Sequence, residues 1–452
     1  MPTLVRPLYP ARNRGAAALT AVVLTVALCC CSGASEPSPG GRSGGTGGRV
    51  VLIGIDGADW RVIRPLMERG ETPHLSRIVA EGSSGVLRSM EPSASPSLWT
   101  TVATGVGPER HGIHGFVVPE PSGDVRPVTS SMRRAPAFWN ILPQFERRAG
   151  VVGWLVTWPA EPVDGFMVSA YLPYLFNWST GRPLKGTIVD GIPQQTYPPE
   201  LIDELAPLKV APADLDPALL ARFYDPSRIA GLGRDELECI EGFRWSVACD
   251  ETYRHIGLAL FDREPVDLFA IYFGGADVAS HRFWKFANPE AMAYGVTEEE
   301  AAVLGRVIDA YYIHLDAMIG EYLQRLGADD TLVIISDHGF KPVLIPGRPT
   351  TSAHHRMEGI IALWGRGIRR GGTIDAAGLL DVLPTLLALL DVPLSMDLEG
   401  RVLEQAFEPA WVLDHRPRFV DRYQVAESPR GPDASEVDPN VLERLRSLGY
   451  ID

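Results

Sequence analysis

Short apolar runs that end in polar residues constrain the fold of this chain more than any other feature. The runs occupy residues 49–56, 150–157, 267–273 and 331–335. Continuous apolar runs of this length are typical of strands buried on both faces of a parallel sheet. Helical patterns at 235–262 and 311–326 separate the runs, shorter strands are expected at 85–89 and 360–364, and a final helix at 379–390. The alternation predicts an α/β fold in which helices sandwich a central, mainly parallel sheet.

Carboxylates and imidazoles lie beside these strands, at the edge where open α/β sheets bind ligands. They are Asp56 after the first run, Asp277 and His281 after the third, Asp337 and His338 after the fourth, and His354 and His355 before the strand at 360–364. A spacing of four places Asp277 and His281 on one face of a helix. Taken singly, Asp56 is equally well explained as a helix cap, and an Asp–His pair at this spacing is more often exposed to solvent. Their joint occurrence at strand ends favours metal binding.

Ser95 lies in the segment 91–115, between small residues and prolines just before a predicted helix. Pro96 suits the first position of that helix, where free N–H groups and the positive end of the helix dipole favour an anionic oxygen. A serine hydroxyl is a poor nucleophile until a base or a metal ion activates it. Ser95 is therefore the candidate nucleophile. An ordinary N-cap serine is the alternative, and Ser93 and Ser97 are the competing hydroxyls.

Hydrolysis of a phosphate ester requires stabilisation of the charge on the phosphoryl, attacking and leaving oxygens. Two cations about 3.5–4 Å apart can provide it. The expected ligand sets are Asp56, Asp337 and His338 with Ser95 as a bridging oxygen, and Asp277, His281 and either His354 or His355. Mixed carboxylate and imidazole ligands suit zinc, and manganese also fits. The chain is expected to be a secreted two-metal hydrolase that forms a phosphoseryl intermediate.

The N-terminus has the pattern of a targeting segment. Arginines precede an apolar stretch at 16–28 that is short for a membrane span, and three cysteines follow at once. The pattern resembles a bacterial lipoprotein signal over 1–31 with Cys31 as the lipidated residue, followed by a flexible Ser/Gly/Pro tether over 32–48. A plain secretory signal or an uncleaved anchor is the alternative. We expect the protein at the bacterial cell envelope, attached to the membrane by this lipid anchor.

The remaining chain, 49–452, is expected to form one catalytic domain with an insertion or cap around 177–234, a segment rich in Pro and charge. The net charge of −14 argues against a nucleic acid polymer as partner and is compatible with a small phosphorylated substrate once metals are bound. Cys239 and Cys249 lie ten positions apart on one predicted helix, about 15 Å of rise and too far for a disulfide. They are expected to be buried apolar residues.

Five motifs, in this order, resemble the alkaline phosphatase superfamily and, among its branches, type I phosphodiesterase/nucleotide pyrophosphatase. They are VVLIGIDGAD at 50–59, SPSLWTTVATGVGPERHGI at 95–113, GADVASH at 275–281, SDHGF at 336–340 and HHRMEGIIALWGRGI at 354–368. The resemblance implies an alkaline phosphatase-like fold, two divalent metal ions and the following site residues: Ser95 as nucleophile and Asp56, Asp277, His281, Asp337, His338 and His355 as ligands. His355 is preferred to His354 because it directly precedes the Arg-Met-Glu-Gly run.

Two departures from the family pattern bear on the substrate. Nucleotide-cleaving members usually have threonine as the nucleophile and an asparagine soon after it, where this chain has Ser95 and Leu98. Nucleotide recognition is therefore in question. His111 and His114 resemble structural parts of a turn.

The sequence does not fit a sulfatase but is compatible with several other activities. A sulfatase requires Cys or Ser followed by x-Pro-x-Arg, whereas Pro-Ser-Leu follows Ser95. A phosphomonoesterase, a phosphonate hydrolase or a phospho-group transferase of the same superfamily would share the ligands. The alternative from another class is a non-catalytic envelope lipoprotein, which the intact ligand set disfavours. The natural substrate and the oligomeric state stay open.

Overall fold

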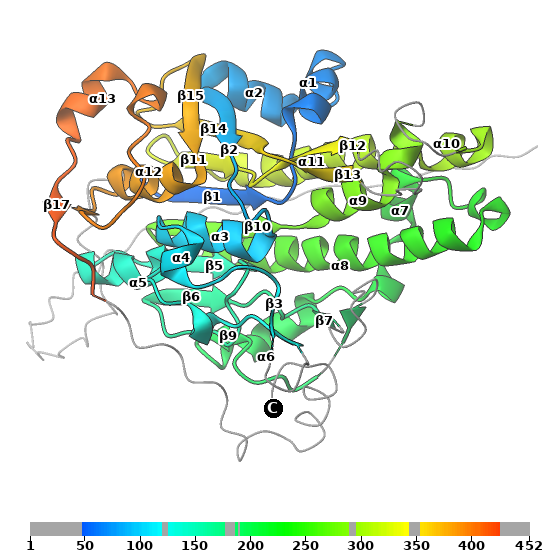
Figure 1. Ribbon diagram of the computed structural model, residues 1–452, viewed down its shortest axis with the longest axis horizontal. Helices are drawn as coiled ribbons and strands as arrows, with labels where there is room; N and C mark the ends of the chain where they lie inside the picture. The colour runs from blue at the N-terminus through cyan, green and yellow to red at the C-terminus, as the bar shows by residue number, and fades with distance from the viewer. Residues whose placement is uncertain are drawn as a thin grey trace, which may run out of the picture. The chain divides into compact units, whose positions relative to one another are not determined.

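A nine-stranded sheet forms the centre of the described part of the chain (Figure 1). The computed structural model describes residues 48–119, 125–176, 186–188, 190–288, 295–342 and 353–424. The strands, in spatial order, are β15 (Gly372–Gly378), β2 (Ser83–Arg88), β14 (Glu358–Gly365), β11 (Thr331–Ile335), β1 (Val50–Ile55), β10 (Leu268–Phe273), β5 (Ala149–Val152), β6 (Gly165–Val168) and β9 (Thr196–Tyr197). Only β14 and β9 run against the others in this sheet. The predicted α/β fold with a mainly parallel sheet is confirmed.

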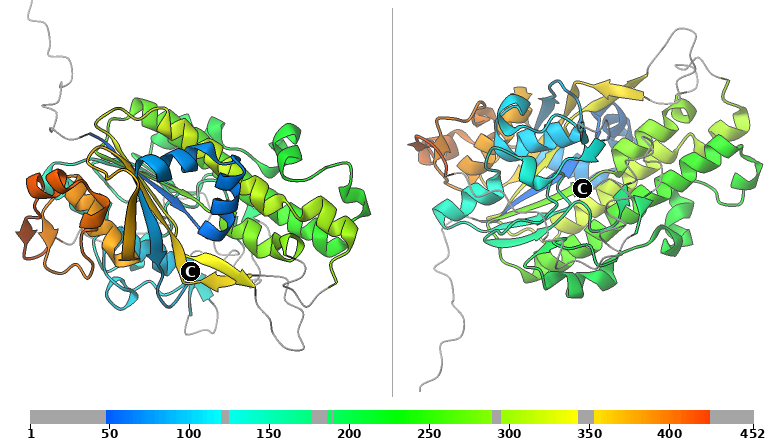
Figure 2. Two further views of the ribbon diagram at one scale, coloured as in Figure 1. Left: turned by 90° about the horizontal axis from the view of Figure 1, so that it is seen from above. Right: turned by 60° about the horizontal axis from the view of Figure 1, so that its bottom comes forward.

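Strand β1 shows why the sheet has helices on both faces. Its residues are all buried, and alternate side chains enter two separate cores. Val51 and Ile53 pack with α1 (Trp60–Glu68), α2 (Pro73–Glu81), α8 (Arg234–Arg263), α9 (Gly275–Ala287) and α11 (Val307–Leu323). Val50 and Leu52 pack with α3 (Ser95–Thr104), α5 (Phe138–Ile141) and α12 (Val382–Leu389). Figure 2 shows the green helices on one side of the sheet and the orange ones on the other. Full burial of one such side chain contributes roughly 1.5–3 kcal/mol.

Two expected elements differ in the structure. The run at 150–157 continues past β5, but the strand ends at Val152 because Gly153 adopts φ +70° and the ring of Tyr253 occupies the space beside it. The segment 379–390 begins with a 3-10 turn at Leu379–Asp381 before α12. That helix is also not the last one, because α13 (Pro409–Asp414) follows it.

The segment 186–234, described apart from residue 189, consists mainly of short elements. It includes α6 (Leu201–Leu205) and α7 (Pro217–Phe223), and then leads into α8. Phe223 of α7 packs against Phe243 of α8 and Tyr311 of α11, with ring centroids 5.2 and 5.7 Å away. Helix α7 therefore packs against both α8 and α11.

The N-terminal predictions concern residues that the structure does not describe. The signal peptide over 1–31, the candidate lipidated Cys31 and nearly all of the 32–48 tether lie outside the described residues. Within the described ranges, no helix combines the length and the hydropathy needed to cross a membrane.

Candidate metal centre

Asp56 is the first residue after β1, so it lies at the carboxyl end of this central strand, and it is buried. Tyr272 donates its hydroxyl to Asp56 Oδ2 at 2.6 Å, and Trp99 Nε1 donates to the same oxygen at 3.3 Å. The other oxygen, Oδ1, lies 3.4 Å from Ser95 Oγ and 3.3 Å from His338 Nε2. Two donors thus hold one side of the carboxylate, and the other side faces the candidate nucleophile.

Ser95 is the first residue of α3 and lies inside the helix rather than at its cap. Ala94 occupies the N-cap and provides no side-chain cap, so the N-cap explanation of Ser95 does not apply. Ser95 as a residue is 5% exposed and lines a cavity. By contrast, Ser97 is fully buried in α3 and its hydroxyl has no hydrogen-bond partner. Of these two hydroxyls, the structure gives only Ser95 access to a ligand.

Asp337 and His338 follow β11, the neighbour of β1 in the sheet. The Gly57 N–H donates to Asp337 Oδ1 at 3.3 Å. His338 Nδ1 lies 3.2 Å from the Gly339 carbonyl oxygen, which can only accept, so in the neutral imidazole that binds a metal ion Nδ1 carries the proton and Nε2 the lone pair. His338 Nε2 and Asp337 Oδ2 are buried and make no hydrogen bond. Two unpartnered buried acceptor atoms therefore face one point.

Asp277 and His281 lie on α9, and His355 lies on β13 (Ala353–Arg356), which pairs with β12 (Gly339–Pro342). Asp277 Oδ1 is 3.3 Å from His281 Nε2 and 3.8 Å from His355 Nε2, and the two Nε2 atoms are 3.1 Å apart. His355 Nδ1 donates to the Ser93 carbonyl oxygen at 2.8 Å, which again leaves Nε2 for a ligand. His354 is exposed, since neighbouring strand residues point to opposite faces.

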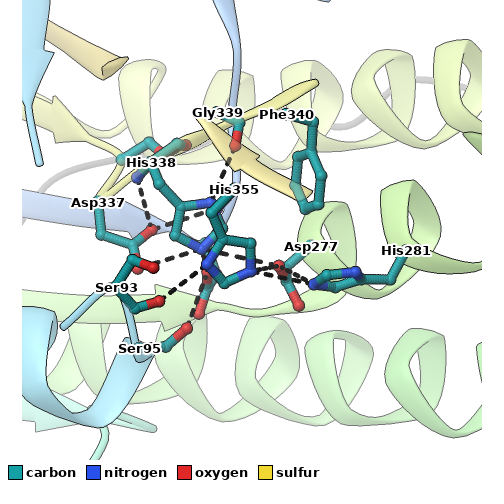
Figure 3. Close-up of polar contacts among 12 residues, drawn as sticks. Ser93, Ser95, Asp277, His281, Asp337, His338, Gly339, Phe340 and His355 are labelled. Atoms are coloured by element: carbon teal, nitrogen blue, oxygen red, sulfur yellow. Dashed lines mark hydrogen bonds and ion pairs between the residues drawn. The ribbon is translucent and has the colours of Figure 1, made fainter. Parts of the chain in front are cut away.

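The two candidate ligand groups contact each other through His338 and Asp277, whose Nε2 and Oδ1 atoms are 3.8 Å apart. Figure 3 shows His338 and His355 stacked at the centre, with Asp277 and His281 to one side and Asp337 to the other. The two central imidazoles have ring centroids 3.6 Å apart. Among the described residues, the atoms of two groups lie within 4.8 Å of one another, namely Asp56, Asp337 and His338, and Asp277, His338 and His355. The first group matches an expected set, whereas the second contains His338 where His281 was expected. The structure nevertheless brings all seven predicted side chains into one cluster.

Electrostatics explain why this cluster suits a cation. Burial and the nearby charges of Asp56 and Asp277 raise the pKa of Asp337 well above its usual range. Burial alone would lower the pKa of His338, but the carboxylates of Asp337, Asp56 and Asp277 raise it to about 10. Two buried carboxylates and the half-buried carboxylate of Asp277 therefore favour a positive charge between them. Divalent ions held by oxygen and imidazole ligands supply this charge, so the residues present fit metal ions.

Four residues at the site were not predicted from the sequence. Trp99 lies one helical turn after Ser95, and this i, i+4 spacing was a usable signal. Tyr272 reaches Asp56 only through strand pairing of β1 with β10. Asp250 on α8 accepts from the N–H groups of Gly274 and Gly275 and so holds the start of α9.

The fourth unpredicted residue is Phe340. Its fully buried ring packs edge-on against the imidazoles of His281, His338 and His355. Phe340 directly follows the SDHG run on the hairpin that carries His355, but no local pattern marks it as a support for three ligands.

A family model and several solved structures relate this chain to known proteins. The family model described as "Type I phosphodiesterase / nucleotide pyrophosphatase" matches residues 50–375, which contain all seven predicted site residues. No curated protein matches the chain significantly.

Solved structures also resemble the fold. A phosphonoacetate hydrolase from Sinorhizobium meliloti 1021, in complex with phosphonoformate, is 20% identical with a TM-score of 0.40, over 67% of this chain and 59% of that one. The 2-O GAG sulfatase BT1596 is 12% identical with a TM-score of 0.47, over 80% of this chain and 74% of that one. The chain thus spans about three-fifths of the hydrolase structure that it matches.

Proposed function

Because the chain belongs to the type I phosphodiesterase / nucleotide pyrophosphatase family, we propose that it hydrolyses phosphate esters or anhydrides with Ser95 as nucleophile. The family is one of phosphoric ester hydrolases, so the expected enzyme class is confirmed at the level of the family. One observation supports the specific proposal most directly. The Ser95 hydroxyl lies 3.4 Å from Asp56 Oδ1, inside a cluster of carboxylates and imidazoles and at the wall of a cavity.

Two divalent metal ions would occupy the cluster, and mixed carboxylate and imidazole ligands suit zinc. The proposed ligands are Asp56, Asp337, His338 and Ser95 for one ion, and Asp277, His281 and His355 for the other. When bound, such ions lower the pKa of a coordinated hydroxyl or water and neutralise charge on the phosphoryl oxygens. His338 and His355 are already oriented for this role, because each donates Nδ1–H to a backbone carbonyl.

The residues of the chain divide the reaction into two displacements. Ser95 Oγ loses its proton and forms a bond to phosphorus while the bond to the leaving oxygen breaks; the leaving oxygen takes up a proton, and a phosphoseryl group results. A water molecule then attacks the same phosphorus, and the Ser95–phosphorus bond breaks with return of the proton to Ser95. The N-terminus of α3 favours negative charge on the serine oxygen, and Tyr272 and Trp99 keep Asp56 facing it.

The decisive experiment measures hydrolysis of bis-p-nitrophenyl phosphate, p-nitrophenyl phosphate and p-nitrophenyl sulfate by the full chain, with and without a chelator. Ser95→Ala is expected to lose about 10⁴-fold or more in kcat while keeping its fold and metal content. The matched control is Ser97→Ala, which removes an unpartnered hydroxyl from the same helix and should retain activity.

The panel also separates the alternatives. Selective turnover of p-nitrophenyl phosphate would favour a phosphomonoesterase, and transfer to added alcohols a transferase. Activity in the metal-free protein would contradict the mechanism. No turnover of any substrate by a metal-loaded protein would favour the non-catalytic lipoprotein.

The cellular location is a separate proposal that rests on the N-terminal sequence alone. Lipidation at Cys31 would hold the enzyme at the bacterial envelope, outside the cytoplasm. Cys31→Ser is expected to move the protein from the membrane fraction to the soluble fraction. Unchanged fractionation would favour a different anchor.

A further inference from the structure

A cavity of about 530 Å³ opens beside Ser95 and Asp56. One face of α8 forms its length, through residues spaced by three and four positions: Cys239, Gly242, Ser246, Cys249 and Tyr253. This stripe covers about 21 Å of helix, and the cavity volume is within the usual range of roughly 300–1,000 Å³ for small-molecule sites. The two cysteines are half-buried and line this cavity, which corrects the expectation that both are buried apolar residues. The site is therefore much larger than a phosphate group requires.

Aromatic rings give this cavity flat, apolar walls. Tyr174 and Trp245 line it and pack edge-to-face with their ring centroids 5.2 Å apart. Gly186 of β8 (Gly186–Thr187) lies against both rings, since a Cβ there would be 2.2 Å from Tyr174 and 2.7 Å from Trp245. Tyr253 donates its hydroxyl to the Ala170 carbonyl oxygen at 2.8 Å. These contacts hold the rings in place, so the walls suit a planar or aliphatic group.

Arg282 supplies positive charge to the same cavity. It follows His281 on α9, and its guanidinium lies over Gly242, where a Cβ would come within 2.4 Å of it. Among the described lining residues, Arg282 is the only arginine or lysine. A fixed guanidinium in an apolar cavity is suited to binding a carboxylate or a second phosphate.

We propose that this cavity binds the organic group of the substrate, and that this group is a flat apolar moiety with an anionic substituent that contacts Arg282. This inference rests on the proposed phosphodiesterase function and adds the substrate class. Trp245 and Arg282 determine specificity, whereas the ligand cluster acts on the phosphorus.

The test uses two symmetrical diesters, bis-p-nitrophenyl phosphate and bis(3-carboxy-4-nitrophenyl) phosphate. Because both ester groups of each substrate are identical, the carboxylate enters the cavity whichever group leaves. For the carboxylated diester, Arg282→Gln should lower kcat/KM by about 10- to 100-fold, the range expected for a charge-assisted hydrogen bond, and for the plain diester by less than threefold. Trp245→Ala should raise KM for both diesters.

Two further variants control the experiment. Arg282→Lys keeps the charge and should retain part of the preference, and it serves if the glutamine variant does not fold. Arg234→Gln removes the same charge from α8 at a side chain that is 89% exposed. It should leave kcat/KM unchanged for both diesters.

The possible outcomes separate this inference from the proposed function. Equal losses on both diesters in Arg282→Gln, or an unchanged KM in Trp245→Ala, would overturn the inference while phosphodiesterase activity stands. Failure of the metal-loaded wild-type protein to hydrolyse either diester would overturn both proposals. Elemental analysis of each variant shows whether the ligand cluster is intact.

Discussion

The metal-ligand cluster and the α8-lined cavity touch at Ser95 but are built in different ways. In the cluster, polar side chains leave the ends of neighbouring strands and the start of α9, and they meet within 4 Å. In the cavity, residues along one face of α8 leave space between side chains, and rings and a guanidinium fill the edges. The first region is dense in charge, and the second is mostly apolar.

This difference separates chemistry from selection. Ligands at strand ends are positioned by the backbone of the sheet, so a small displacement of any one alters the reaction on every substrate. The cavity walls act only on groups that reach them. The described residues of 186–234, part of the expected insertion or cap, do not line the cavity, whereas α8 does. Four changes test how sharply the two regions can be separated.

The largest effect is expected at Asp337, which serves the cluster alone. Asp337→Asn keeps the shape but removes a charge that a cation needs, so metal content should fall by about one ion per chain. Activity should fall by about 10²–10³-fold, equally on small and large substrates. Asp309→Asn is the control, since that carboxylate is exposed and paired with Arg69. A loss confined to large substrates would contradict the separation.

Gly153 tests the cavity wall through stability. It adopts φ +70°, and a Cβ would lie 2.7 Å from the ring of Tyr253, so Gly153→Ala combines backbone strain with a clash and should cost about 3 kcal/mol of unfolding free energy. Gly70 has φ +71° with nothing within 4 Å, so Gly70→Ala should cost only about 1 kcal/mol. Urea unfolding of both variants measures the difference, and equal costs would show that Tyr253 yields.

Buried His111, which contacts the helix that carries Ser95, should make the stability of the protein depend on pH. The Ile113 N–H donates to His111 Nδ1 at 3.1 Å, and His111 Nε2 lies 3.0 Å from Thr101 Oγ1 of α3. Burial, with the charges of His114 and Arg133, lowers the pKa of His111 from 6.5 to about 4.

Between pH 6.5 and pH 4, His111 therefore binds a proton in the unfolded chain but stays neutral in the folded one. This stability is fully present above pH 6.5 and decreases as the pH falls towards 4. The loss should reach about 2 kcal/mol at pH 5, and His111→Gln should flatten the curve. Urea unfolding at several pH values checks this, and parallel curves for both proteins would refute it.

The smallest effect is expected at Tyr272, which lines the cavity and also donates to Asp56. Tyr272→Phe keeps the ring but releases Asp56 Oδ2, so activity should fall by about tenfold with little change in KM. Tyr322→Phe removes a buried hydroxyl that has no hydrogen-bond partner and should leave activity unchanged. A change in KM alone would assign Tyr272 to the cavity rather than to the cluster.

The sequence by itself determined the strands, the fold class and the set of polar residues at strand ends. Apolar runs such as 331–335 are local patterns. Asp337 and His338 follow this run, so they lie at the carboxyl edge of the sheet whatever the order of the strands. The spacing of four likewise located Asp277 and His281 on one face of α9.

Tertiary structure alone decided what depends on contacts between distant segments. The sequence already favoured His355 over His354 and Ser95 over Ser97, but the physical reasons, the direction of each side chain on β13 and access to the cavity, exist only in the folded chain. Tyr272, Asp250 and Arg282 gained their positions from strand pairing and from the packing of α8 on α9. No local pattern records these contacts, because the atoms concerned are brought together by parts of the chain tens to hundreds of residues apart.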